Sequence, residues 1–287
     1  MYRIFLMRAA EFSEFKSFID SKAQSFRGKV SLADLKKLWQ EAQEDYHIGI
    51  EERMIQPSEE DLERIKISLK KISKQNAFQK IKPKIKYLDF RKVVSIQFNI
   101  DFDYIKRICD RINNNETYLL DLALPLSNSE QHVEINRVNN LEFIISSLNT
   151  DLRFQGLELM GENVERENES GQIGIVANIG YGIKELWCIN YQGRDILFNG
   201  YHRAVALISA GITHIPVVYQ SVENDDELLS LVGQIGLDAC KDILSRDIIP
   251  LVSDFTVDKF VYKLDTPQPI KLIRLKIFVE EMEIKIP

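Results

Sequence analysis

The stretch FNGYHRAVALISAGITHIPVV, residues 198–218, decides the fold because it carries a strand end, a helix and a second strand in succession. Asn199 and Gly200 interrupt an apolar run, and glycine adopts backbone conformations that are closed to other residues. From Tyr201 the apolar spacing predicts a helix of about ten residues that stops at Gly211. IPVVY (215–219) then predicts the next strand, since proline is tolerated near the start of a strand.

The residues before this stretch predict a β-hairpin. LWCINY (186–191) is apolar at every position except Asn190, which is typical of a central strand covered on both faces. QGRD (192–195) has the composition of a tight turn, and ILF (196–198) predicts the returning strand. The sequence therefore predicts the order strand, turn, strand, Asn-Gly, helix, strand.

A helix that begins directly after a glycine presents unpaired backbone N–H groups to the preceding loop. Their partial positive charge favours an anion by about 0.3–1 kcal/mol at exposed sites. Arg203 adds a guanidinium that can bind phosphate with two hydrogen bonds, and His202 adds a further donor. In the functional interpretation Asn199-Gly200 leaves room for the anion. In the structural interpretation Arg203 pairs with an acidic neighbour, His202 makes a supporting hydrogen bond and Gly200 only permits a turn.

The stretch Ile196–Tyr219 resembles the phosphate-binding core of the ParB/sulfiredoxin superfamily. Members of that superfamily carry G-x-[HR]-R-x-x-A between a hairpin and a helix, and then an exit strand that begins G-[LI]-x-x-[IV]-P-V. The matching residues are Gly200, His202, Arg203, Ala206, Gly211, Ile212, Ile215, Pro216 and Val217. The resemblance implies a ParB/sulfiredoxin-like fold with a nucleotide or phosphate at Asn199, Gly200, Tyr201, His202 and Arg203, and it extends weakly over residues 85–222.

The branches of this superfamily differ at single positions. Sulfiredoxins have a reactive Cys where this chain has Tyr201, so their activity is not expected. ParB proteins have G-E-R-R-x-R-A and a helix-turn-helix domain, and this chain lacks clear counterparts of two basic positions and of that domain. Free-serine kinases and nuclease-like members have D-G-x-H-R, whose Asp helps to hold a metal. Asn199 replaces that Asp and is a poorer Mg²⁺ ligand, which leaves Asp195 or Glu185 as candidate metal ligands or acid–base groups.

Residues 1–80 are predicted to form a helical N-terminal module. Ser31 with Asp34, and Ser58 with Asp61, have the spacing of N-caps before amphipathic runs, and a third helix is predicted over residues 9–26. The module either packs on the rest of the chain or binds a protein partner.

A basic segment follows this module. Its lysines alternate with apolar residues, which predicts an exposed edge strand whose charges discourage pairing with other strands. The alternative is a strip that contacts the phosphates of a nucleic acid. The basic residues are Lys80, Lys82, Lys84, Lys86, Arg91 and Lys92.

The remaining signals predict a mixed α+β fold. Strands are expected at 93–98 and 118–126, a helix at 102–113, a polar insertion at about 161–171, a helix capped by Asn224, and one or two strands at 270–286. The predicted domains are the helical module (1–80), the ParB/sulfiredoxin-like core (81–222) and a C-terminal helix with strands (223–287).

The composition limits the classes of protein that the chain can belong to. With 43 acidic and 37 basic residues among 287, it has a net charge of -6 and no overall attraction for nucleic acid or anionic membranes. No apolar run approaches the roughly 20 residues that span a bilayer, and the chain starts without a secretory signal. The three cysteines are widely spaced, which predicts reduced, buried thiols and a cytoplasmic protein without a cysteine zinc site.

These observations predict a nucleotide- or phosphate-binding protein with a regulatory or accessory role. The nucleotide is expected to be ATP, ADP or CTP, with Mg²⁺ as a candidate cofactor. One alternative is a Mg²⁺-dependent phosphotransferase or nuclease of the same fold. The other is a DNA-binding protein that uses the basic segment.

Overall fold

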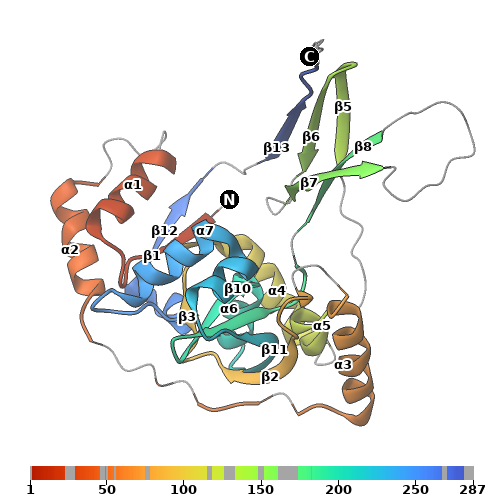
Figure 1. Ribbon diagram of the computed structural model, residues 1–287. Helices are drawn as coiled ribbons and strands as arrows, with labels where there is room; N and C mark the ends of the chain where they lie inside the picture. The colour runs from red at the N-terminus through yellow and green to blue at the C-terminus, as the bar shows by residue number, and fades with distance from the viewer. Residues whose placement is uncertain are drawn as a thin grey trace, which may run out of the picture. The chain divides into compact units, whose positions relative to one another are not determined.

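The computed structural model describes residues 2–22, 30–45, 49, 51–54, 56–74, 78–114, 118–125, 133–147, 152–160, 174–181, 183–266 and 270–280. It has the mixed α+β class that the sequence predicts. The chain divides into two compact units, of which unit 1 holds Met1–Ser127 and Lys184–Pro267 and unit 2 holds Asn128–Ile183 and Gln268–Pro287 (Figure 1).

These boundaries differ from the predicted division into 1–80, 81–222 and 223–287. The N-terminal helices, the hairpin region and the helix after Asn224 all belong to unit 1. Residues 128–183 separate from the predicted core and join the C-terminal segment in unit 2. Local composition does not reveal this division, because unit 2 is assembled from two separate stretches of chain. The predicted insertion at 161–171 lies outside the described residues.

The larger sheet of unit 1 contains the predicted hairpin. Its strand order is β2-β11-β9-β10-β3, with β9 and β10 antiparallel, β11 parallel to β9 and β2 antiparallel to β11. The hairpin turn places Gln192 and Gly193 at φ 52° and 74°, as a tight two-residue turn requires. The predicted edge strand is confirmed, because β2 borders the sheet. The strands are β2 (Lys84–Asp89), β3 (Val94–Ser95), β9 (Trp187–Tyr191), β10 (Arg194–Asn199) and β11 (His214–Ser221).

Helix α6 (Tyr201–Ser209) connects β10 to β11, as predicted. It ends at Gly211, which has φ 81°, and the N–H of Ile212 donates to Leu207 O at 2.9 Å. This bond across a left-handed glycine satisfies a carbonyl at the end of the helix. Most of α6 is buried, and it packs against α4, α5 and the short helix η2. The start of α6 is therefore fixed on several sides.

A second sheet of unit 1 was not predicted. Its order is β12-β1-β4, and both pairings are antiparallel. The sequence interpretation of residues 1–80 as helices is wrong for β1, whose residues Ile4, Phe5 and Leu6 are buried. The strands are β1 (Tyr2–Leu6), β4 (Asn99–Asp101) and β12 (Val261–Asp265).

The helices of unit 1 begin where the sequence places caps. The side chains of Ser31, Ser58 and Asn224 accept hydrogen bonds from the backbone N–H three residues later, which confirms all three predictions. Gly233 has non-helical angles and kinks α7. The helices are α1 (Phe12–Lys22), α2 (Leu32–Ala42), α3 (Glu59–Ile72), α4 (Phe102–Asn114), α5 (Tyr118–Ala123), α7 (Asp225–Leu244), η2 (Val252–Thr256) and η3 (Asp258–Phe260).

Two predicted strands differ from the structure. Residues 118–123 form α5 and not a strand, and in the segment 93–98 only Val94–Ser95 is strand. A short, continuously apolar run has no period that separates a buried strand from a buried helix. Leu119, Leu120 and Leu122 are all buried in α5, so its sequence lacks the polar face of a surface helix.

Unit 2 consists of β structure in the part that the structure describes. A three-stranded sheet has the order β13-β6-β5, and β7 pairs with β8. The C-terminal strand prediction is confirmed by β13. The strands are β5 (Glu134–Asn139), β6 (Glu142–Ser147), β7 (Leu152–Met160), β8 (Gly174–Tyr181) and β13 (Lys271–Lys276).

The cysteines are free thiols, as predicted. Cys188 and Cys240 are buried, and Cys109 is half-buried. Burial raises the pKa of all three thiols, which disfavours the reactive thiolate. Among the described helices, none combines the length and apolar character needed to cross a membrane.

Candidate functional site at the start of α6

Gly200 joins β10 to α6 under two constraints. Its backbone is left-handed, at φ 96° and ψ 24°, and a Cβ atom there would lie 2.1 Å from Leu186 Cδ2. Asn199 Nδ2 donates to Glu185 O at 2.7 Å and holds the end of the hairpin together. The space beside Gly200 is thus occupied by Leu186. Packing against Leu186 and the left-handed backbone both require a glycine here, whether or not an anion binds at the start of α6.

Tyr201 is part of the core. Its ring is buried, its hydroxyl accepts a hydrogen bond from Ile96 N at 3.1 Å, and it donates to Leu197 O. Burial raises the pKa of this hydroxyl, which stays protonated. Tyr201 fastens α6 to β10 and to the segment after β3, and its ring is not free to stack on a ligand.

His202 also has an internal partner. Its Nε2 accepts a hydrogen bond from the backbone N–H of Asp101 at 2.9 Å, and its ring packs edge-on against Tyr104 at 5.3 Å between centroids. Burial lowers the pKa of the imidazole to about 4, so the ring is neutral at pH 7. His202 holds α6 to the start of α4, as in the structural interpretation, and does not supply a positive charge.

Arg203 lies where two helix ends meet. Its Nη1 donates to Leu122 O, in the last turn of α5, at 2.8 Å. Its Nη2 would be 3.0 Å from a Cβ atom on Gly200, so the guanidinium rests against the first residue before α6. The planar group has five N–H donors. Arg203 therefore brings positive charge to the end of α6 where backbone N–H groups point outward.

Glu185 is the second charged group beside this junction. It is 7% exposed, its backbone carbonyl binds Asn199, and its Oε2 has no hydrogen-bond partner among the described residues. A buried carboxylate oxygen without a partner is costly, and a cation would relieve the cost. Mg²⁺ commonly takes one or two carboxylates and completes its shell with water and substrate phosphates. No group of three or more His, Cys, Asp or Glu side chains in the described ranges has metal-binding geometry.

Asp195 does not belong to this site. It lies at the opposite end of β10 from Asn199, which is roughly 13 Å along an extended strand. Its Oδ1 accepts hydrogen bonds from Asn190 Nδ2 at 2.7 Å and from the Tyr219 hydroxyl at 3.1 Å. Its Oδ2 is 3.8 Å from Lys86 Nζ. The structure thus removes Asp195 as a metal ligand for α6 and leaves Glu185.

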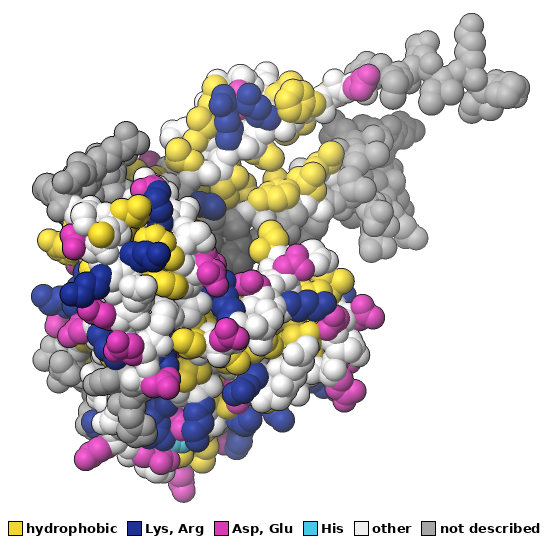
Figure 2. All heavy atoms as spheres, turned by 90° about the vertical axis from the view of Figure 1, so that its left-hand side faces the viewer, with side chains coloured by type: hydrophobic (Ala, Val, Ile, Leu, Met, Phe, Trp, Pro, Cys, Tyr) yellow, Lys and Arg dark blue, Asp and Glu magenta, His cyan; other side chains and the backbone are white. Residues whose placement is uncertain are grey.

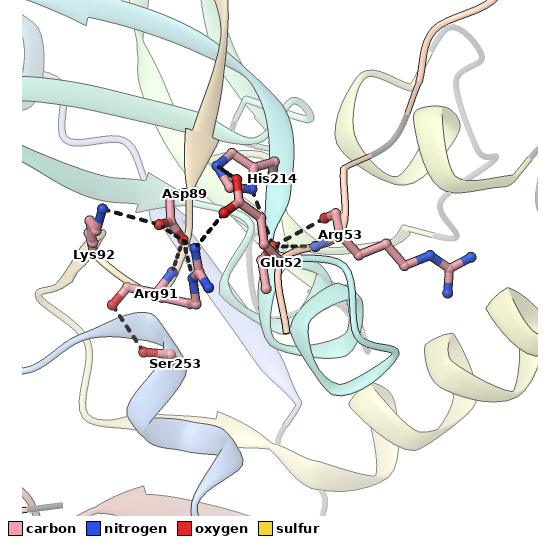
Figure 3. Close-up of polar contacts among 8 residues, drawn as sticks. Glu52, Arg53, Asp89, Arg91, Lys92, His214 and Ser253 are labelled. Atoms are coloured by element: carbon pink, nitrogen blue, oxygen red, sulfur yellow. Dashed lines mark hydrogen bonds and ion pairs between the residues drawn. The ribbon is translucent and has the colours of Figure 1, made fainter. Parts of the chain in front are cut away.

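The predicted basic strip is partly neutralised. Arg91 makes two hydrogen bonds to Asp89, from Nε at 2.8 Å and from Nη2 at 2.9 Å, and lies 3.7 Å from Glu52. Lys92 is 3.5 Å from the same Asp89 carboxylate, and both contacts appear in Figure 3. Lys80, Lys82 and Lys84 are exposed, and Lys86 contacts Asp195.

The face of the molecule that Figure 2 shows has no continuous basic patch among its described residues. On the side of the molecule that Figure 2 shows, Lys and Arg side chains are interleaved with Asp and Glu side chains. The electrostatic attraction that a nucleic acid needs is weakened where cations already have acidic neighbours.

Figure 3 also shows a polar cluster that sequence reasoning missed. His214 lies between Glu52, at 3.4 Å from Nε2, and Thr213, at 3.2 Å from Nδ1. The order hydroxyl, imidazole, carboxylate is that of a nucleophile with its base. The Thr213 hydroxyl, however, is buried and lies 3.1 Å from Arg53 O, which takes its single proton. The cluster connects Glu52 and Arg53 to the start of β11. Arg53 and Thr213 lie 160 positions apart in the sequence, so no local pattern could have predicted it.

Comparison of the chain with protein-family models, with curated proteins and with solved structures found no match. The resemblance to ParB/sulfiredoxin proteins rests on the motif residues alone.

Proposed function

We propose that this chain binds a nucleotide or another phosphorylated small molecule at the N-terminus of α6 and acts as a regulatory or accessory protein. The observation that carries the proposal is the position of Arg203, whose guanidinium rests against Gly200. A phosphate at this end of α6 would meet that guanidinium together with the first backbone N–H groups of the helix. His202 and Tyr201 support the site from behind and do not touch the ligand.

Glu185 supports a role for Mg²⁺ in the same site. Its unpartnered Oε2 is the kind of ligand that Mg²⁺ takes, and a nucleotide would supply phosphate oxygens to the same ion. The metal would neutralise charge on the phosphates and fix their position.

A binding role agrees better with the contacts than catalysis does. A general base must reach a substrate proton, and the Nε2 of His202 already accepts a hydrogen bond from the backbone N–H of Asp101. Asp195 is held at the far end of β10. Glu185 alone would have to serve as metal ligand and base, which makes the phosphotransferase or nuclease alternative the weaker one.

Binding is tested by isothermal titration calorimetry with ATP, ADP, CTP and inorganic phosphate, each with and without Mg²⁺. Arg203→Ala is expected to weaken binding at least tenfold, because hydrogen bonds to charged groups contribute about 1.5–3 kcal/mol. The variant also loses the bond to Leu122 O, so near-UV circular dichroism must show that it is folded.

Arg194→Ala is the matched control. Arg194 is exposed at the start of β10, so the variant loses the same charge away from α6. Glu185→Gln is expected to keep phosphate binding and to abolish its enhancement by Mg²⁺. Equal affinities in the parent, Arg203→Ala and Arg194→Ala would overturn the proposal.

A further inference from the structure

A hollow in unit 1 is lined by Tyr201 but by none of the groups proposed to touch a phosphate. It has a volume of about 680 Å³ and lies between α1, the segment that connects β3 to β4, and the end of β10. This size falls in the range of small-molecule sites. The side chains that carry the argument are Phe18, Gln97, Phe98, Asn99 and Phe198.

The walls of this hollow are aromatic. Phe98 and Phe198 are half-buried and present ring surface, whereas Phe18 lies deeper and is 7% exposed. The rings are fixed by neighbours, since Phe98 stacks on Phe5 at 6.0 Å and Phe198 contacts Trp187 at 5.6 Å. Rigid rings favour a planar, aromatic occupant, which packs edge-to-face or offset against them without ordering flexible side chains.

The polar side chains of the hollow include two amides, Gln97 and Asn99, beside Glu14, Ser17 and Ser21. Gln97 Nε2 donates to Asn99 O at 2.6 Å, which turns its amide toward β4 and leaves its carbonyl oxygen as an acceptor. The Asn99 side chain has no hydrogen bond to any residue in the described ranges, so its donor and its acceptor are both available. An amide pairs with the edge of a heterocycle through one donor and one acceptor, as in base recognition. A purely aliphatic occupant would leave these amides unsatisfied.

The charges beside the hollow compensate one another. Glu14 lines it and receives two hydrogen bonds from Arg246, at 2.8 and 2.9 Å. Arg246 also binds Asp242 and lies over the Phe98 ring at 5.0 Å. Because Arg246 is already paired with both carboxylates, its positive charge does not favour an anionic ligand here.

We propose that this hollow binds an uncharged, planar heterocycle of the nucleobase class, packed against the rings of Phe98 and Phe198 and hydrogen-bonded by Asn99 and Gln97. The site goes beyond the phosphate site proposed for α6 and does not depend on it. The heterocycle is either a free base or nucleoside, or the base of a nucleotide.

The test is saturation-transfer NMR of the full chain with adenosine, guanosine, cytidine and uridine at millimolar concentration, followed by titration of those that bind. At least one nucleoside is expected to receive saturation on its base protons. Asn99→Leu removes the hydrogen-bond donor and the acceptor of the side-chain amide at similar volume. It is expected to weaken binding at least fivefold. Phe98→Leu removes an aromatic ring from the wall of the hollow and is expected to weaken binding several-fold.

Two variants in unit 2 serve as controls. Phe154→Leu and Asn136→Leu make the same changes at exposed positions and are expected to leave nucleoside binding unchanged. If Asn99→Leu fails to fold, Phe98→Leu carries the test. Phenol is the probe for a merely apolar hollow. The proposal is overturned if no nucleoside binds the folded parent, or if phenol binds as tightly and both hollow variants behave as the parent does.

Arg203→Ala separates this site from the phosphate site. Nucleosides carry no phosphate, so they are expected to bind Arg203→Ala as they bind the parent, even if no phosphate compound binds either protein. Nucleoside binding with no phosphate binding would leave the hollow supported and would refute the function proposed for α6. If both sites hold parts of one nucleotide, ATP or CTP binding weakens in Asn99→Leu and in Arg203→Ala, whereas inorganic phosphate responds to Arg203→Ala alone.

Discussion

At the scale of single residues, the junction Asn199–Arg203 shows why a binding motif cannot be interpreted from its letters alone. Leu186 packs where a side chain on Gly200 would lie. Tyr201 accepts a hydrogen bond from the backbone of Ile96, and His202 accepts one from the backbone of Asp101. Each of these contacts makes its residue necessary for the fold whether or not a ligand binds. Arg203 also has an internal partner, Leu122 O, and its guanidinium lies beside Gly200 at the start of α6.

Gly200→Ala tests the two constraints on this glycine. The left-handed backbone costs about 1–2 kcal/mol with a Cβ atom, and displacing Leu186 adds about 1–3 kcal/mol, so we expect a loss of about 3 kcal/mol. Gly193→Ala is the matched control, since its φ is 74° and nothing lies within 4 Å of its Cβ position. That variant is expected to lose about 1 kcal/mol. Urea denaturation gives both values, and equal losses would show that the Leu186 contact is unimportant.

The part of the site that can be predicted is the part set by neighbours in sequence. Gly200 and the start of α6 follow from local turn and helix signals. The partners of Tyr201 and His202 lie 105 and 101 positions away, and Leu122 lies 81 positions from Arg203. Such pairings depend on how the sheet and α4 are brought together, and no spacing within residues 198–218 encodes them.

At the scale of elements, capping residues and glycines predicted where helices begin and end. Short apolar runs did not predict whether a segment is a helix or a strand. Ser31, Ser58 and Asn224 each begin a helix because their side chains satisfy N–H groups that the helix leaves unpaired. By contrast, α5 and β1 are short and mostly apolar, with one charged residue each, Asp121 and Arg3. Their state is decided by tertiary contacts, such as the pairing of β1 with β12, and these are absent from the local sequence.

Helix α7 offers a test at this scale. Asn224 Oδ1 accepts from Glu227 N at 3.0 Å, so Asn224→Ala is expected to lower the free energy of unfolding by about 1 kcal/mol. Asn224→Ser restores a side-chain acceptor and is expected to recover most of that loss. Chemical denaturation monitored by far-UV circular dichroism compares the two variants with the parent. If the serine variant is as unstable as the alanine variant, the cap does not act through this hydrogen bond.

At the scale of the whole molecule, two buried groups give opposite dependences of stability on pH. Burial raises the pKa of Asp254 to about 6 from an ordinary 3.8. Its contribution to the free energy of unfolding is therefore full below pH 3.8 and is lost as pH rises through 6. Burial lowers the pKa of His202 to about 4 from 6.5, so its contribution is full above pH 6.5 and is lost as pH falls toward 4. Each difference corresponds to about 3 kcal/mol.

Between pH 4 and 6.5 the loss of stability from Asp254 and the gain from His202 largely cancel. The variant Asp254→Asn removes one of the two titrations, so the other becomes measurable. The amide keeps an acceptor for Leu251 N, which binds Asp254 Oδ2 at 2.8 Å, and removes the titration. Relative to the parent, the variant is expected to be more stable at pH 7.5 and to lose that advantage by pH 4. Its contact with Arg8, at 3.9 Å in the parent, reduces the gain. Urea denaturation across this range measures the difference, and a difference that does not change with pH contradicts the assignment.

The position of β1 in the middle of its sheet sets an order of assembly. Leu6 pairs with Val261, so β1 is synthesised long before β12 and meets it only after nearly all of unit 1 has been made. At 5–20 residues per second, the wait is roughly 10–50 s. Until β12 is made, Ile4, Phe5 and Leu6 lack the strand that pairs with one edge of β1, and a chaperone that shields such edges would bind at this apolar segment.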